Sequence, residues 1–246
     1  MTEFELIHFY TQLPLEFSSQ NGDELLKKLV SLDKIIQNQI EAQPKAKTIS
    51  EAKGLEITSQ GIIISLPLSL EQDFYSDQLK ILIKAGTHLE PGAYLKGPTY
   101  IKEHCYIGHQ AYIRENTWLE ARVSVGHASE VKRSIILNNS SIAHFNYVGD
   151  SILGAYVNFG AGSKIANLEF RSLADKREAR FKKMRLPFKN YPDFTKLGAI
   201  IGDGVEVGCG AIIAPGTFIA QNSSLLPNCF VKKGYYVEHS RITPDG

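Results

Sequence analysis

Residues 83–125 read IKAGTHLEPGAYLKGPTYIKEHCYIGHQAYIRENTWLEARVSV, and an aliphatic side chain recurs at every sixth position of this stretch. The series extends to position 137 with ten aliphatic members: Ile83, Leu89, Leu95, Ile101, Ile107, Ile113, Leu119, Val125, Val131 and Leu137. A second series has the same period: Ile201, Val207, Ile213, Ile219, Leu225, Val231 and Val237. An α-helix repeats near 3.6 residues and a β-strand near 2.0, so a period of six is typical of neither alone. It predicts short strands that are joined by turns and stacked into a solenoid.

Small residues are common two positions before the aliphatic ones. They include Ala93, Thr99, Cys105, Ala111, Thr117, Ala211, Thr217 and Ser223. In such a coil the aliphatic side chain points into a narrow prism, and the small residue fits the tight corner. The sequence therefore predicts a mainly β protein, a parallel β-helix of hexapeptide repeats. Its similarity to that repeat class, rather than the spacing, implies left-handed coils, an exception to the right-handed crossover rule.

Two parts of the chain are distinguishable. Residues 1–77 are expected to form an N-terminal extension, with an amphipathic helix from Glu24 to about Glu41 after a candidate cap at Asp23. We expect the apolar face of this helix to pack on the β-helix or on a neighbouring subunit. Residues 78–246 are expected to form the β-helix domain. An inserted basic loop at residues 168–196 interrupts the period.

The composition excludes few classes of function. The chain has 27 basic and 26 acidic residues, so its charge indicates neither a nucleic-acid partner nor a membrane partner. The three cysteines, Cys105, Cys209 and Cys229, have no zinc-ligand spacing and form no disulfide framework. The chain begins with no signal peptide, and no apolar run reaches the roughly 18 residues of a membrane span. We therefore expect a soluble, cytoplasmic protein.

Two cations occupy the same phase of the repeat. Arg114 follows the aliphatic Ile113, and Lys132 follows Val131, which lies 18 residues later. The period predicts that both side chains project from one edge of the prism, one coil apart. Two stacked cations suit an anionic group such as a phosphate. The alternative is solvated surface charge.

The six-residue period breaks between Leu137 and Leu153, and this segment contains His144 and Tyr147. Sites often lie where a regular backbone is locally distorted. An imidazole titrates near neutrality and is suited to act as a general base, and Glu130 is a candidate to orient it. A lone histidine is more often a structural residue, so His144 by itself does not decide the function.

The runs EVK at 130–132, AHFNYVGD at 143–150 and VNFGAG at 157–162 carry a specific resemblance. They resemble the acetyltransferase domain of the bifunctional N-acetylglucosamine-1-phosphate uridyltransferase/glucosamine-1-phosphate acetyltransferase family, and residues 114–167 align with it without gaps. The resemblance implies that His144 is the catalytic base and that Glu130 supports it. It implies the following substrate-binding residues: Arg114, Lys132 and Tyr147 for the phosphate, Asn158 for the sugar, and Asn167 beside the amine and acyl group.

A later run, IIGDGVEVGCGAIIAPGT at 200–217, resembles the acetyl-CoA-binding coils of the same family. The resemblance implies cofactor contacts at Gly160, Ala161, Cys209 and Pro227, with Cys209 at a position where the family has a serine. It also implies acetyl-CoA as co-substrate, no metal, and a homotrimer of parallel prisms that share sites.

The implied reaction is N-acetylation of an amino-sugar 1-phosphate, here glucosamine 1-phosphate. His144 takes a proton from the 2-amino group, which attacks the thioester, and backbone amides near residues 160–162 stabilise the oxyanion. The product, N-acetylglucosamine 1-phosphate, would feed UDP-N-acetylglucosamine and cell-envelope synthesis.

The sequence departs from the family in two places. Nothing in it corresponds to the glycine-rich nucleotide loop of the uridyltransferase half, so no nucleotidyl transfer is expected. Around Asn167 it has IANLEF where the family has CNYDG, which leaves open glucosamine or galactosamine and the length of the acyl chain. The basic loop at 168–196 is either a lid that attracts phosphates or a solvated loop.

Two other classes of function remain open. A metal enzyme of the γ-carbonic anhydrase type shares the solenoid, and the spacing of His104 and His109 suits it, although a third ligand is missing at the expected distance. An acyltransferase-like scaffold without catalysis is the other alternative. The retained set of seven site residues argues against it.

Overall fold

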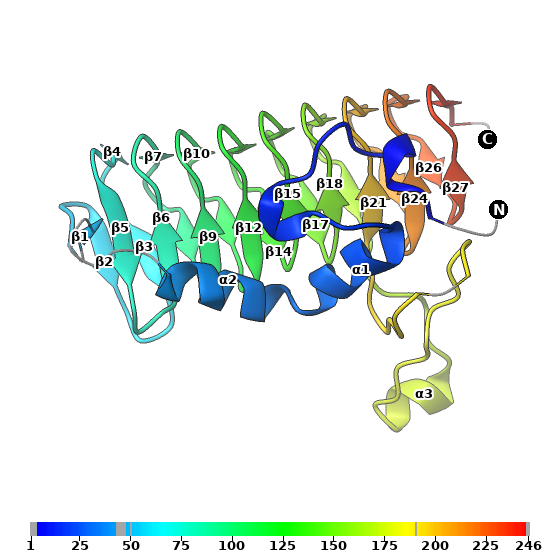
Figure 1. The fold of residues 1–246 in the computed structure, drawn as a ribbon, viewed down its shortest axis with the longest axis horizontal. Coiled ribbons are helices and arrows are strands. Elements are labelled where there is room, and N and C mark those ends of the chain that lie inside the picture. The colour runs from blue at the N-terminus through cyan, green and yellow to red at the C-terminus, as the bar shows by residue number, and fades with distance from the viewer. Residues whose placement is uncertain (1–3, 43–47, 50, 190, 245–246) are drawn as a thin grey trace.

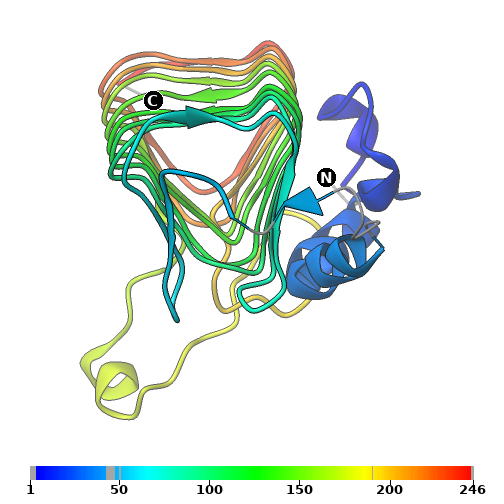
Figure 2. The same cartoon turned by 90° about the vertical axis from the view of Figure 1, so that its left-hand side faces the viewer.

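The computed structural model describes residues 4–42, 48–49, 51–189 and 191–244. The chain winds into a three-sided prism in which successive coils add one short strand to each of three sheets (Figure 1). Seen along the prism from its N-terminal end, the chain turns anticlockwise as it recedes, so the helix is left-handed (Figure 2). The predicted fold class, a left-handed parallel β-helix with a small helical extension, is confirmed.

The three sheets are named A, B and C. Sheet A contains β1 (Thr48–Ile49), β5 (Asp73–Ser76), β6 (Ile81–Ile83), β9 (Thr99–Ile101), β12 (Thr117–Leu119), β15 (Ile135–Ile136), β18 (Ile152–Leu153), β21 (Ala199–Ile201), β24 (Thr217–Ile219) and β27 (Tyr235–Tyr236). Sheet B contains β2 (Leu55–Ile57), β3 (Ile62–Ile64), β8 (Tyr94–Leu95), β11 (Tyr112–Ile113), β14 (Glu130–Lys132), β17 (Tyr147–Gly149), β20 (Lys164–Ile165), β23 (Ile212–Ile213) and β26 (Phe230–Val231). Sheet C contains β4 (Leu68–Ser69), β7 (His88–Leu89), β10 (Tyr106–Ile107), β13 (Ser124–Val125), β16 (Ser141–Ile142), β19 (Asn158–Phe159), β22 (Glu206–Val207), β25 (Ser224–Leu225) and β28 (Arg241–Ile242).

Each coil visits the sheets in the order A, C, B, and equivalent strands of neighbouring coils pair in parallel and in register. On sheet B, for example, Ile113 pairs with Val131, and Val131 pairs with Val148. The N-terminal end is different, because β3, β4 and β5 pair antiparallel with the first strands of the prism. Among the parallel strands, paired residues are 17 or 18 positions apart in the sequence, or 48 where the insertion intervenes.

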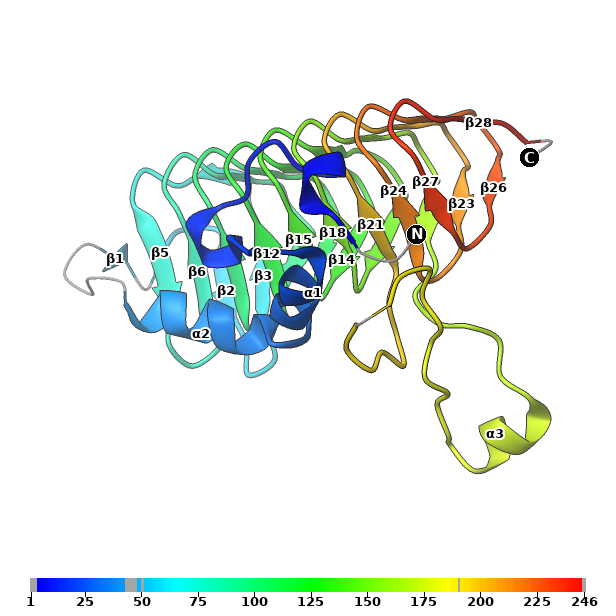
Figure 3. The same ribbon diagram turned by 45° about the vertical axis from the view of Figure 1, so that its right-hand side comes forward.

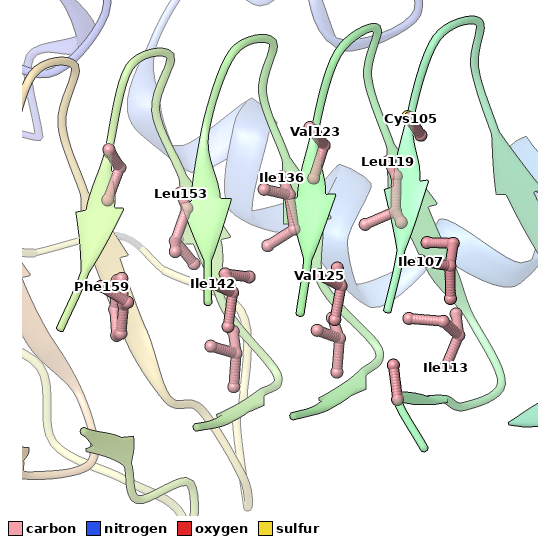
Figure 4. Close-up of a cluster of buried hydrophobic side chains, with 14 of the residues drawn as sticks. Cys105, Ile107, Ile113, Leu119, Val123, Val125, Ile136, Ile142, Leu153 and Phe159 are labelled. Carbon is pink, nitrogen blue, oxygen red and sulfur yellow. The ribbon is translucent and has the colours of Figure 1, made fainter. Parts of the chain in front are cut away.

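The interior of the prism is a column of aliphatic side chains (Figure 4). The predicted inward series from Ile83 to Val131 and from Ile201 to Val231 is buried in this core. The prediction was wrong for the last residue of each series. Ile136 rather than Leu137 points inward, because this coil is one residue shorter and Leu137 packs outside the prism. Val237 is 56% exposed, and Tyr236 takes its place against the core.

The outer face of sheet A is covered by the N-terminal segment. This segment contains the short helices η1 (Leu6–His8) and η2 (Leu15–Phe17) and the α-helices α1 (Gly22–Val30) and α2 (Leu32–Glu41). The Phe17 ring meets Trp118 of β12 edge-on, with 4.9 Å between ring centroids. The apolar side of the helices thus packs on the β-helix, the first of the two surfaces expected for it.

The single helix expected from Glu24 to Glu41 is in fact two helices that meet at Ser31. Its cap is Asn21, whose side chain accepts the backbone N–H of Glu24 at 3.1 Å, and not Asp23. Within the described ranges, no helix has both the length and the apolar character that crossing a bilayer requires.

The insertion leaves the prism after β20 and returns before β21 (Figures 1 and 3). Its outer part carries α3 (Leu173–Arg177) and stands away from the sheets, as Figure 2 also shows. We call residues 168–183 the arm. The inner part folds back, and Met184, Phe188 and Phe194 are buried against sheet A and the N-terminal segment.

Ile142 lies fully buried on β16 in the interior of the prism. We expect Ile142→Ala to lower the free energy of unfolding by about 2–5 kcal/mol, because a closed prism collapses poorly around a cavity. The control Ile57→Ala, at a 42% exposed position on β2, is expected to cost less than about 0.5 kcal/mol. Urea denaturation followed by circular dichroism measures both, and equal losses would contradict this account of the core.

Candidate active site

The turns that lead from sheet C to sheet B form one long edge of the prism, the C–B edge. Six residues occupy the same place in successive coils of this edge: His109, His127, His144, Ala161, Cys209 and Pro227. The backbone N–H of Gly162 donates to the carbonyl oxygen of His144 at 2.9 Å, and the equivalent bond recurs in the next two coils. The predicted base and the predicted cofactor residues therefore lie in line on four consecutive coils.

The approach between coils is close at this edge. A Cβ atom on Gly160 would lie 2.5 Å from the backbone nitrogen of Cys209, so only glycine fits there. The N–H groups of Gly160 and Gly162 already donate to carbonyl oxygens of neighbouring coils. Several backbone amides of residues 160–162 were expected to face the substrate, but these two are already occupied, which leaves one candidate. The N–H of Ala161 has no backbone acceptor among the described residues.

The imidazole of His144 is exposed and, in the described part of the chain, forms no side-chain hydrogen bond. The turn that carries it is well supported. Phe145 donates its N–H to the carbonyl oxygen of His127 at 2.9 Å, and the two rings meet edge-on at 5.0 Å. The His127 ring stacks in turn on His109 at 5.5 Å. His144 thus projects into solvent from a turn packed against the coil before it.

The turns from sheet B to sheet A form a second edge, the B–A edge, and Arg114 and Lys132 lie there at equivalent positions of adjacent coils. This confirms their predicted shared edge. Arg114 donates from Nη1 to Glu130 at 2.9 Å and from Nη2 to Glu115 at 3.2 Å, and the bond to Glu130 is the main cause that raises the pKa of the guanidinium. Lys132 has no ion-pair partner within the described residues.

Glu130 was expected to support His144. In the described residues no hydrogen bond joins the two side chains, and Glu130 instead accepts the bond from Arg114. It lies beside Tyr147 on sheet B, where the two residues are paired in the strand register. Within one chain, Glu130 therefore pairs with Arg114 of the B–A edge and not with His144.

Tyr147 belongs to a hydrogen-bonded group with Asn167 and Asp150. The Asn167 amide Nδ2 donates to the Tyr147 hydroxyl at 3.1 Å and to the carboxylate of Asp150. Burial, then the charges of Asp150 and Glu130, raise the pKa of Tyr147. Asp150 was not singled out in the sequence analysis, although it lies in the quoted run AHFNYVGD. Its position as an acidic residue directly after a strand end could have identified it.

Asn158 lies apart from this group. It is exposed on sheet C and donates from Nδ2 to Glu206 at 3.1 Å. Arg114, Lys132 and Asn167 therefore lie at the B–A edge, and the Tyr147 hydroxyl joins them through its hydrogen bond to Asn167. Asn158 lies on sheet C, beyond the C–B edge.

One strand of sheet B separates the two edges. His144 precedes β17 on the C–B edge, and the three residues of that strand lead to Gly149, which pairs with Lys132 at the B–A edge. Three residues of extended chain span about 10 Å. A ligand lying on the outer face of sheet B between the two edges would meet an imidazole from one edge and long cationic side chains from the other.

The cations of the arm are partly engaged. Lys182 forms an ion pair with Asp175 at 3.0 Å, and the Arg171 guanidinium lies 4.4 Å from the centre of the Phe181 ring. Glu169 of the arm forms an ion pair with Lys233 at 2.6 Å.

The residues that suggested a metal enzyme are separated within one chain. His104 lies in a turn between sheets A and C, whereas His109 lies on the C–B edge. In the described ranges, no cluster of three or more histidine, cysteine, aspartate or glutamate side chains could hold a metal ion.

Comparison with known proteins agrees with the resemblance found in the sequence. Residues 95–179 match the family model described as the GMPPB C-terminal domain. The chain is 43% identical over 153 residues to the bifunctional protein GlmU of Methanococcus maripaludis, with 62% of this chain and 36% of that protein covered. It is 34% identical over 172 residues to a bifunctional sugar-1-phosphate nucleotidylyltransferase/acetyltransferase of Sulfurisphaera tokodaii, with 70% of this chain and 41% of that protein covered. The resemblance is thereby confirmed, and the chain spans 36–41% of the length of these two relatives.

Solved structures give weaker likenesses. A putative acetyltransferase from Desulfovibrio desulfuricans G20 is 20% identical with a TM-score of 0.32, and covers 62% of this chain and 26% of its own. The polysialic acid O-acetyltransferase OatWY is 16% identical with a TM-score of 0.29, and covers 67% of this chain and 81% of its own. At these TM-scores the two likenesses support no inference about the site.

The three cysteines differ in access. Cys209 is exposed on the C–B edge, whereas Cys105 and Cys229 are buried. Burial raises the pKa of Cys105 to about 12 and also raises the pKa of Cys229. At pH 8 we expect iodoacetamide to modify one thiol per native chain, because alkylation requires an accessible thiolate.

Mass spectrometry of the intact chain counts the adducts. Cys209→Ser should abolish the fast reaction, and Cys105→Ser should leave it unchanged. Rapid modification of a second thiol would contradict the placement of these residues.

Proposed function

We propose that this protein is an acyltransferase that moves an acetyl group from acetyl-CoA to the 2-amino group of an amino-sugar 1-phosphate. The observation that carries the proposal is the alignment of His144 with Gly160, Ala161, Cys209 and Pro227 on the C–B edge, one strand away from the cations of the B–A edge. The relative named as a bifunctional sugar-1-phosphate nucleotidylyltransferase/acetyltransferase supports the reaction class.

In the proposed reaction the substrate lies across the outer face of sheet B. Arg114, Lys132 and the Tyr147 hydroxyl bind its phosphate, and this places the amine near His144. The amine attacks the thioester carbonyl while His144 accepts its proton. The tetrahedral intermediate collapses and coenzyme A leaves as the thiolate.

One backbone group is suited to stabilise the oxyanion of that intermediate. The N–H of Ala161 lies one coil after His144 and is not used by the coil-to-coil hydrogen bonds of the described residues. A preorganised donor of this kind lowers the barrier because its dipole needs no reorientation during the reaction. The exposed thiol of Cys209, one coil further, lies along the path proposed for the cofactor.

We propose that the working form is a homotrimer. The N-terminal segment covers sheet A, whereas sheets B and C expose large apolar side chains such as Ile212, Phe230 and Tyr106. If sheet B of each copy meets sheet C of the next, a ring of three closes. That packing brings Asn158 of a neighbouring copy towards the face that carries Tyr147. It thereby accounts for the separation of these two residues within one chain.

The first prediction concerns the base. His144→Ala should lower the rate of thiol release from acetyl-CoA with glucosamine 1-phosphate about a hundredfold or more, because a general base is lost. His239→Ala removes an exposed histidine on a different edge and should leave the rate unchanged. Galactosamine 1-phosphate is assayed in parallel and decides the preferred sugar.

No thiol release by the native protein with either sugar phosphate would overturn the proposal. The scaffold alternative would then predict no thermal stabilisation by acetyl-CoA. The metal-enzyme alternative would predict stoichiometric zinc in the purified protein.

The second prediction concerns the phosphate. Arg114→Ala and Lys132→Ala should each raise KM for the sugar phosphate roughly tenfold or more, since a hydrogen bond to a charged group contributes about 1.5–3 kcal/mol. KM for glucosamine without phosphate should not change. Lys34→Ala, which removes an exposed cation from α2, is the control. Equal effects on both substrates would show that these cations do not bind the phosphate.

A further inference from the structure

A buried carboxylate lies at the B–A edge and takes no part in the steps above. Asp150 is 3% exposed and follows β17 with a left-handed backbone, at φ 51°. Its N–H donates to the carbonyl oxygen of Lys132 at 2.9 Å, and its own carbonyl oxygen accepts from Gly198 at 2.9 Å. The backbone of Asp150 is therefore fixed by the coils on both sides.

The side chain of Asp150 faces two partners. Its Oδ2 accepts a hydrogen bond from the Asn167 amide, and its Oδ1 lies 3.7 Å from a guanidinium nitrogen of Arg133. An ionised carboxylate has no proton to donate, so Asn167 must turn its NH₂ group, and not its oxygen, towards Asp150. The Oδ1 atom of Asn167 then lies on the opposite side of the amide.

The same constraint passes to Tyr147. The NH₂ group of Asn167 also donates to the Tyr147 hydroxyl at 3.1 Å. A hydroxyl has one proton, and here its oxygen is the acceptor, so the proton remains available to another group. The carboxylate of Asp150 thus sets the direction of two successive hydrogen bonds.

We propose that Asp150 is a positioning residue that gives the site its polarity. Because Asp150 holds the NH₂ group of Asn167, the Oδ1 atom of Asn167 is left to accept an N–H of the substrate amine. The Tyr147 hydroxyl, which accepts from the same NH₂ group, is left to donate to the substrate phosphate. This inference rests on the proposed function. It adds a reason why the site selects a ligand that carries an N–H donor next to anionic oxygens.

A structural tie alone would explain Asp150 equally well, so the test reverses the polarity and keeps the contact. Asn167→Asp places two carboxylates together and should lower both Tm and activity. The exchange Asp150→Asn with Asn167→Asp restores a donor–acceptor pair with the roles swapped. The Tyr147 hydroxyl would then donate to the carboxylate at position 167, and its proton would no longer reach the phosphate.

We expect the exchange to recover most of the Tm that Asn167→Asp loses, while KM for glucosamine 1-phosphate stays at least about tenfold above the native value. In the native background Tyr147→Phe should raise KM by a similar factor, but in the exchanged background it should change KM less than about twofold. Such non-additivity is the signature of a shared interaction. Recovery of both Tm and KM by the exchange, or additive effects of Tyr147→Phe, would overturn the proposal.

A second readout needs no substrate. The pKa of Tyr147 follows from absorbance titration at 295 nm of each protein minus its Tyr147→Phe counterpart. The exchange should raise this pKa above the native value, because the amide donor that favours the phenolate is replaced by a carboxylate. An unchanged or lower pKa would refute the polarity argument. If the native protein proves inactive on both amino-sugar phosphates, the proposed function fails and the titration still decides the role of Asp150.

Discussion

The structure depends on the in-register parallel pairing of each coil with the next. Every strand of two to four residues is stable only because its neighbours in the adjacent coils accept and donate its backbone hydrogen bonds and because its inward side chain fills the prism. The corners complete the constraint. Residues such as Asn116 and Asn139 adopt positive φ there, a conformation that asparagine tolerates better than most side chains.

This pairing turns sequence spacing into columns of side chains. Residues of one type that recur once per coil stack on one another along an edge, as the rings of His109 and His127 show. Function follows from the same geometry. A base on one edge and a cationic group on the other are separated by a single short strand, so their side chains reach the same ligand on the outer face of sheet B.

The N-terminal segment makes the three faces unequal. It buries the outer side of sheet A under helices and aromatic rings, and the inner part of the insertion joins this layer through Phe188 and Phe4. Within one chain, sheets B and C are left uncovered by this layer and carry the polar groups of the candidate site. Between those groups, the buried carboxylate of Asp150 imposes a direction on hydrogen bonds that the sequence motif leaves undefined.

The repeat period alone predicted the solenoid, the inward column and the shared edge of Arg114 and Lys132, because period and register are local properties of a repeat. The resemblance singled out His144 and the cofactor residues, which the fold then aligned on one edge. The sequence could not show that Ile136 and not Leu137 points inward, because Ile135, Ile136 and Leu137 are consecutive and all aliphatic. Likewise, the break between α1 and α2, the pairing of Glu130 with Arg114 and the place of Asp150 emerged only in the tertiary structure. Each of these depends on contacts between segments that are far apart in the chain or on adjacent coils, and on which hydrogen-bond partners the burial leaves within reach.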